Sequence, residues 1–103
     1  MDSKDSKKPT KEEIYEVLKT VIDPEIGYDV VSLGEIDDVI IENDRILIKF
    51  IPTTPLCPYL PYMFDEIQTK IKEKFGLDVE FEISDKPWSI DRVNPEVRKK
   101  LGL

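Results

Sequence analysis

The hydrophobic positions follow two different spacings along the chain, and these predict two helices, a hairpin and a third strand. Apolar side chains recur every three or four positions in residues 14–22 and again in residues 60–75, the spacing of an amphipathic helix. Residues 36–42 and 45–51 are rich in isoleucine and flank Asn43-Asp44, so we expect them to form a β-hairpin. In residues 77–83 apolar and acidic side chains alternate, which is typical of a strand with one face in water.

Capping and turn residues predict where these elements begin and end. Thr10-Lys11-Glu12-Glu13 has the form of a capping box at the start of the first helix. Asp23-Pro24 is expected to stop that helix, because the residue before a proline avoids helical geometry. The second helix has two candidate starts, Pro58 and Leu60, and Gly76 is its expected C-terminal cap. An extended segment and a short capped helix follow the third strand.

The expected fold is a small single α/β domain of the α+β type. Its element order is α-β-β-α-β with a C-terminal extension, and the helices should pack on one face of a small mixed sheet. A chain of 103 residues is long enough for one hydrophobic core. Residues 1–9 are mostly polar and are expected to form a disordered tail, which leaves residues 10–103 as the domain.

Composition excludes several classes of site and of protein. The chain has no histidine, so a Ser-His-Asp triad, a Cys-His pair and a histidine-ligated zinc site are excluded within one chain. Its four glycines stand apart, so there is no glycine-rich phosphate loop. No apolar run approaches the roughly 18 residues of a membrane span, and no signal peptide is recognisable. With a single cysteine and therefore no internal disulfide, we expect a cytoplasmic protein without a membrane partner.

The net charge of −7 comes from one segment. Between Thr20 and Asp44 there are eight acidic residues and no lysine or arginine, whereas the rest of the chain has 14 acidic and 15 basic residues. The eight are Asp23, Glu25, Asp29, Glu35, Asp37, Asp38, Glu42 and Asp44. The segment is either a solvated acidic loop and hairpin or a docking face for a basic partner. Nucleic acid is not an expected ligand, because the chain has no basic stripe.

The single cysteine, Cys57, lies in a turn between the second predicted strand and the second predicted helix. A position beside a helix start favours the thiolate, which is the nucleophilic and metal-binding form. Pro55 and Pro58 stiffen the turn, and the hydroxyl groups of Thr53 and Thr54 can bond its amides or the sulfur. Cys57 is either a small buried apolar residue or a reactive or metal-binding thiol, and the rigid turn favours the second.

Two further sets of residues have both a structural and a functional interpretation. Asp23 and Glu25 flank Pro24, where they either solvate a helix stop or place a carboxylate near Cys57 as a hydrogen-bond acceptor or proton handler. Trp88 and Arg92 are either a hydrophobic plug with a salt bridge or an exposed anchor pair for a partner.

Taken together, five segments resemble the SufT/PaaD-like family of iron–sulfur cluster assembly proteins, which includes a subunit of the eukaryotic cytosolic iron–sulfur targeting complex. The family has a small α/β fold, in agreement with the element order above. The resemblance implies that Cys57 is the family's reactive cysteine, that Asp23 and Glu25 form its acidic motif, and that Thr53, Thr54 and Pro55 belong to its cysteine loop. The matching segments are Val21–Gly27, Asp29–Gly34, Thr53–Pro58, Pro87–Arg92 and Leu101–Leu103.

The resemblance implies an accessory role in the maturation of iron–sulfur proteins, without enzymatic activity. Its partners would be a P-loop ATPase that carries clusters and apo client proteins. A cubane cluster is normally held by four thiolates, and one chain supplies only Cys57. Any cluster would therefore be held transiently or shared between chains, for example in a homodimer. Two alternatives remain: a thiol-dependent enzyme with Cys57 as nucleophile, and an interaction module whose cysteine is buried.

Overall fold

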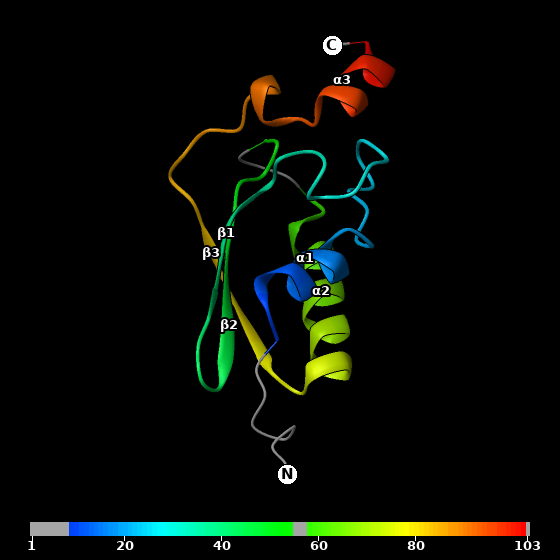
Figure 1. Cartoon of the computed structure of the whole chain (residues 1–103). Helices are drawn as coiled ribbons and strands as arrows, with labels where there is room; N and C mark the ends of the chain where they lie inside the picture. Colours follow the sequence, from blue (N-terminus) through cyan, green and yellow to red (C-terminus); the bar gives the residue numbers. More distant parts are fainter. Residues whose placement is uncertain (1–8, 55–57, 103) are drawn as a thin grey trace.

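The computed structural model describes residues 9–54 and 58–102, which form a small sheet with helices on one face (Figure 1). This confirms the expected α+β fold and its element order, including the short C-terminal helix. A 3-10 turn, Ile90–Arg92, precedes that helix. The elements are α1 (Lys11–Leu18), β1 (Ile36–Ile41), β2 (Arg45–Phe50), α2 (Leu60–Phe75), β3 (Asp78–Ile83) and α3 (Pro95–Leu101).

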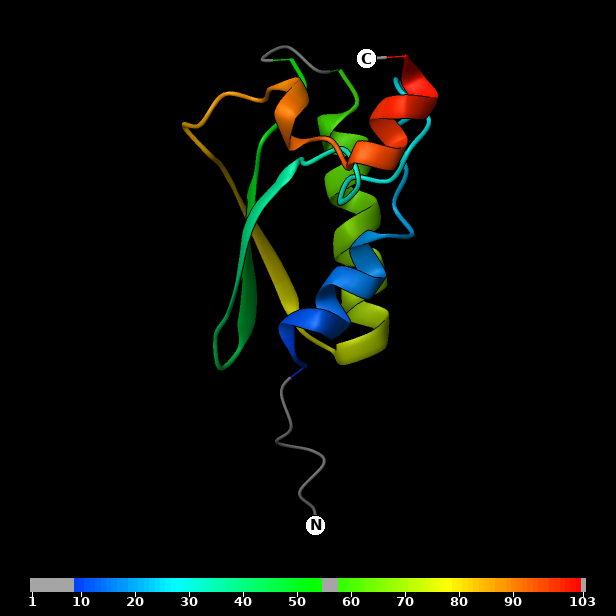
Figure 2. The ribbon, with the colours of Figure 1, turned by 45° about the horizontal axis from the view of Figure 1, so that its top comes forward.

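The sheet is mixed, with the strand order β1-β2-β3. β1 and β2 form the expected antiparallel hairpin, whereas β3 runs parallel to β2. A parallel pair requires a crossover connection, and α2 provides it. Figures 1 and 2 show that α1 and α2 lie side by side on the same face of this sheet.

The hydrophobic core lies between the sheet and the two helices. Phe64 of α2 joins the layers: its ring meets Phe50 of β2 edge-on, with ring centres 5.1 Å apart, and stacks on Phe81 of β3 at 4.0 Å. The edge-on arrangement is favourable for aromatic pairs. The predicted apolar faces of both helices supply the fully buried residues Ile14, Leu18, Met63, Ile67 and Ile71.

Helix α1 begins as predicted but ends earlier than predicted. The capping box is present, because Thr10 Oγ1 accepts from the Glu13 N–H at 3.1 Å and Glu13 Oε1 accepts from the Thr10 N–H at 2.9 Å. The helix ends at Leu18 rather than at Asp23. Ile22 instead forms an isolated antiparallel bridge with Asp29 and is 45% exposed. The apolar spacing through residue 22 therefore reflects pairing with a loop and not a helical face.

Helix α2 begins at Leu60, so the alternative start at Pro58 is wrong. Its other end is as predicted, because Gly76 is the C-cap with φ +71°, a left-handed conformation that glycine adopts without steric cost.

The loops collect at one end of the sheet, opposite the β1–β2 turn (Figures 1 and 2). Residues 19–35 and 84–94 lie at this end, as do the residues that flank positions 55–57. Positions 1–8, 55–57 and 103 lie outside the described residues, and with them Pro55, Cys57 and most of the expected tail. Pro9, the last residue of that tail, is buried. No helix in the described ranges is long and apolar enough to cross a membrane.

Candidate functional site

Asp23 begins a tightly bonded turn in the acidic loop, which we define as residues 23–35. The backbone carbonyl of Asp23 accepts from the N–H of Gly27 at 2.7 Å, and its own N–H donates to Tyr28 O at 2.9 Å. Its side chain is held as well, because Oδ1 accepts from the Glu25 N–H at 2.8 Å. Asp23 is fully buried, whereas Glu25 is exposed. The two acids of the predicted motif thus lie in different environments.

Glu35, the last residue of the acidic loop, is the other fully buried acid among the described residues. Its N–H donates to Val30 O at 3.0 Å, and its carbonyl accepts from the Ile51 N–H at 2.7 Å. The second bond places Glu35 beside Ile51, which directly follows β2 and lies two residues before Thr53. We did not predict Glu35 as a site residue, because its type and spacing do not distinguish it from the other acids of the segment.

The carboxyl groups of Asp23 and Glu35 lie next to each other, and few hydrogen-bond donors reach them. Asp23 Oδ2, both carboxyl oxygens of Glu35 and the hydroxyl of Thr53 are buried without a hydrogen-bond partner among the described residues. Two ionised carboxylates only accept, so they cannot satisfy each other. A proton on Glu35 changes this, because the O–H can donate to Asp23.

Burial is the main reason why the pKa of Glu35 is raised to about 9, and the hydrogen bond to Asp23 and the charge of Asp23 come next. The backbone N–H of Thr53 acts in the opposite direction and lowers this pKa by less, without reaching the two oxygens in hydrogen-bond geometry. Glu35 is therefore protonated at neutral pH.

The cysteine loop, residues 53–58, is described only in part. Thr53 is half-buried and faces Glu35, whereas Thr54 and Pro58 are exposed. A pocket of about 270 Å³ lies between Pro52 and Thr53 on one side and Trp88 on the other. Because Cys57 and Pro55 lie outside the described residues, the closeness of Asp23 to the thiol stays a prediction.

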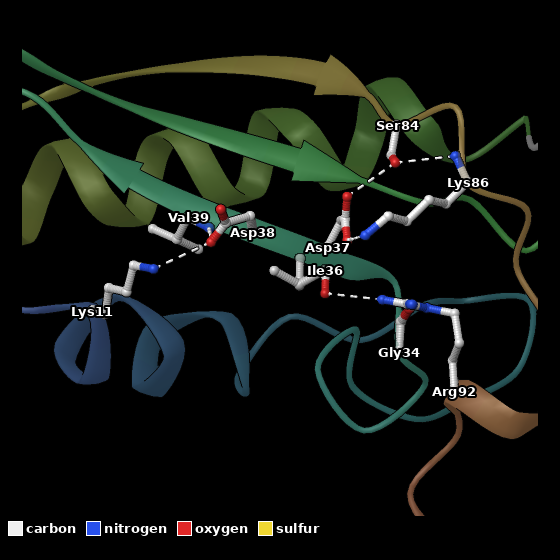
Figure 3. A network of polar contacts seen from close by, with 9 residues as sticks. All are labelled: Lys11, Gly34, Ile36, Asp37, Asp38, Val39, Ser84, Lys86 and Arg92. Carbon is white, nitrogen blue, oxygen red and sulfur yellow. Dashed lines mark hydrogen bonds and ion pairs between the residues drawn. The ribbon is translucent and has the colours of Figure 1, made fainter.

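Trp88 and Arg92 both donate hydrogen bonds to backbone carbonyls of the chain itself. Trp88 Nε1 donates to Leu33 O at 2.7 Å, and Arg92 Nε donates to Gly34 O at 2.7 Å. Arg92 Nη2 reaches Ile36 O at 3.4 Å, as Figure 3 shows. Both side chains are half-buried, and no carboxylate in the described ranges pairs with Arg92. In this structure the two residues hold the C-terminal segment, residues 84–94, against the acidic loop.

Several acids of the segment from Thr20 to Asp44 have basic partners from outside it. Asp37 pairs with Lys86 at 3.1 Å and Asp38 with Lys11 at 3.2 Å (Figure 3). Glu42 likewise pairs with Arg45, at 2.8 Å. Since Asp23 and Glu35 are buried, five of the eight acids are either paired within the chain or removed from the surface. The excess charge counted along the sequence therefore overstates the charge that a partner would meet.

The described residues alone do not provide a metal centre. In residues 9–54 and 58–102 no group of three or more cysteine, aspartate or glutamate side chains is placed to hold a metal ion. The donors at the buried pair are oxygens, whereas clusters are held by thiolates. Of the chain's own residues, only Cys57 has the chemistry to ligate a cluster.

Similar proteins were found by sequence and by structure. Residues 11–84 match the family model described as iron–sulfur cluster assembly protein. A "Fe-S protein maturation auxiliary factor YitW" from Bacillus subtilis is 32% identical over 96 residues, which cover 90% of this chain and 94% of that protein. A "Fe-S protein maturation auxiliary factor SufT" from Staphylococcus aureus is 30% identical and covers 81% of this chain and 98% of its own. These names describe auxiliary factors and not enzymes.

The solved structure of a conserved hypothetical protein from Thermotoga maritima shares the fold. It superposes with a TM-score of 0.80 at 40% identity, over 95% of this chain and 99% of that chain. The family model spans both the acidic loop and the cysteine loop, and the relatives match most of the chain. This chain is therefore a member of the iron–sulfur cluster assembly protein family.

Proposed function

We propose that this chain is an auxiliary factor in the maturation of iron–sulfur proteins and that it acts through Cys57. The observation that carries the proposal is the family match over residues 11–84, a range that contains the buried pair and the cysteine loop. Relatives of similar length carry the name of such a factor. The work of the protein would take place in the cytoplasm.

The number of thiolates limits the mechanism. A cluster is the cargo here, and a stable cubane needs about four thiolates, of which one chain offers one. Cys57 would therefore ligate a cluster only during transfer, with the remaining ligands supplied by a carrier, a client or a second copy in a homodimer. The same chain would serve as an adaptor if it holds carrier and client together without binding the cluster itself. We propose a P-loop carrier ATPase and apo iron–sulfur proteins as these partners.

The chain's own residues would prepare the loop for this exchange. The C-terminal segment fixes the acidic loop through Trp88 and Arg92, and Glu35 is bonded to the end of β2 just before the cysteine loop. Segments anchored on rigid elements pay a low entropic cost when they bind a partner.

Anaerobic reconstitution with iron and sulfide tests the transfer mechanism. The wild-type protein should acquire visible absorption and iron, and Cys57→Ser should acquire neither. If wild type binds no iron but retains binding to a loaded carrier ATPase, the adaptor mechanism is the correct one. Turnover of a small electrophile that depends on Cys57 would instead identify a thiol-dependent enzyme. If an alkylating reagent does not label Cys57 in the native protein, the cysteine is buried.

A further inference from the structure

The side chains of Asp23 and Glu35 form a buried acid pair, and no lysine or arginine of residues 9–54 and 58–102 forms a salt bridge with either. Both are 0% exposed and come from opposite ends of the acidic loop. Moving an ionised carboxylate out of water is unfavourable unless donors or a positive charge replace the lost water. The pair therefore needs an explanation that neither the sequence nor the proposed function provides.

The available donors account for only one of the four carboxyl oxygens. Asp23 Oδ1 accepts from the Glu25 N–H, whereas Asp23 Oδ2 and both oxygens of Glu35 have no partner among the described residues. The donors of Arg92 go to the backbone carbonyls of Gly34 and Ile36, on either side of Glu35, and not to its carboxyl group. If one proton is added to the pair, the carboxyl group that carries it can donate a hydrogen bond to the other carboxylate.

We propose that Asp23 and Glu35 hold one proton between them, and that Glu35, as its donor, is a positioning residue that joins the acidic loop to the start of the cysteine loop. The O–H of Glu35 donates to Asp23 Oδ2, and the backbone N–H of Thr53 lies near the carboxyl group of Glu35. Nothing is transferred in this arrangement; the proton stays on the pair. The inference rests on the proposed function for its biological role, but not for its chemistry.

The electrostatic surroundings support this protonation state. The charged groups with the largest effect on Glu35 are Asp23 and, more weakly, Glu25, and both are negative. They act in the same direction as burial, and only the Thr53 N–H opposes them. In a close carboxyl pair the charge of one group raises the pKa of the other, and here it raises that of Glu35.

Carbon-13 NMR of the full-length protein with labelled glutamate, recorded from pH 4 to pH 10 in the presence of a chelator, tests the proton directly. The signal that disappears in Glu35→Gln identifies Glu35. We expect this carboxyl to titrate well above 4.5, the ordinary pKa of a glutamate. Titration of Glu35 near the ordinary value of 4.5 would overturn the proposal. A signal shifted to the ionised form by added Mn²⁺ or Fe²⁺ at neutral pH would overturn it as well.

Two variants test the positioning role. Glu35→Gln keeps a donor, because its amide can donate to Asp23 Oδ2, whereas Glu35→Leu removes it. Activation of an apo cluster enzyme should fall by roughly tenfold in Glu35→Leu, the order expected for one lost bond to a charged group, and the Gln variant should restore most of it. A folded Gln variant as impaired as the Leu variant would show that Glu35 acts as a base or ligand and contradict the proposal. If wild type itself fails to activate clients, the proposed function fails, and the NMR titration still decides the protonation of the pair.

Discussion

Glu35 makes the stability of this small fold depend on pH. Its pKa is about 9 in the folded chain and 4.5 when exposed, so the folded state keeps a proton that the unfolded state releases between these values. Through this residue the free energy of unfolding should fall as pH rises from about 4.5 to about 9, and change no further above that. Each pKa unit corresponds to about 1.4 kcal/mol.

Urea unfolding of wild type and Glu35→Gln at several pH values checks this dependence. Because the Gln variant has no proton to lose at this position, its stability should gain steadily on that of wild type between pH 5 and pH 9. Stability curves that stay parallel over this range would mean that Glu35 titrates alike in both states.

Cys57→Ser should separate stability from function. The substitution changes one atom, so we expect the melting temperature to change little, with a loss within roughly 0.5 kcal/mol if the thiol is exposed. A thermal melt followed by circular dichroism measures this. A much larger loss would indicate that the thiol packs in the core, which favours the interaction module with a buried cysteine.

At the scale of single residues the sequence does not predict how the candidate site residues are surrounded. Asp23 was recognisable from its motif, but its complete burial was not, and Glu35 could not be told from neighbouring acids because burial depends on contacts between distant segments. Trp88 and Arg92 were singled out as a plug with a salt bridge or as an anchor pair for a partner. Their bonds to the carbonyls of residues 33–36 could not be predicted, because local patterns do not indicate which backbone groups a distant side chain meets.

The contact between the acidic loop and the C-terminal segment depends on a glycine. Gly34 has φ +73°, and a Cβ built there would lie 2.3 Å from the carbonyl oxygen of Arg92. Backbone cannot move aside as a flexible side chain can. Gly34→Ala should therefore loosen the C-terminal segment as well as strain the loop.

Gly27→Ala is the matched control, because Gly27 also has a positive φ, +91°, but among the described residues no atom beyond its chain neighbours lies within 4 Å of the added Cβ. Both variants should lose about 1–2 kcal/mol from the left-handed conformation. Gly34→Ala should lose about 1–3 kcal/mol more from overpacking, and hydrogen exchange at residues 32–36 should accelerate. Equal losses in urea unfolding would show that the close approach to Arg92 is unimportant.

At the scale of elements, local signals correctly predicted the start of α1 and the end of α2. The end of α1 was mispredicted because of a tertiary pairing. The capping box at Thr10 and the glycine cap at Gly76 depend on nearby backbone only, and both are present. The end of α1 was misplaced because Val21 and Ile22 continue the apolar spacing. In the structure their backbone pairs with the acidic loop instead, with Val21 O accepting from the Val30 N–H at 3.0 Å.

For the whole molecule, the thiolate count predicts the stoichiometry of any bound cluster. One chain supplies one cysteine, so an isolated preparation should hold at most about one cluster per two chains, with the other ligands from solution thiols. Size-exclusion chromatography of the anaerobically loaded protein, with iron and protein measured in each fraction, checks this. We expect the iron to elute with a dimer, and a full cluster on the monomer would contradict the shared-ligand mechanism.

Counting charges along the sequence does not show which acidic residues are paired with distant basic residues in the folded molecule. The acidic segment looked unbalanced because its basic partners are distant in sequence: Lys11 comes from α1 and Lys86 from the segment after β3. Folding brings these groups together, as Figure 3 shows for both pairs. Topology, which the sequence predicted correctly, is what places them there.

The most direct test of the account is the activation of an apo cluster enzyme. Apo-aconitase would be mixed under anaerobic conditions with a loaded P-loop carrier ATPase, alone or with wild type or Cys57→Ser, after a melt has shown that both proteins are folded. The account predicts that wild type accelerates the recovery of aconitase activity and that Cys57→Ser does not. Equal acceleration by both proteins, or none by wild type, would contradict the claim that this chain matures iron–sulfur proteins through Cys57.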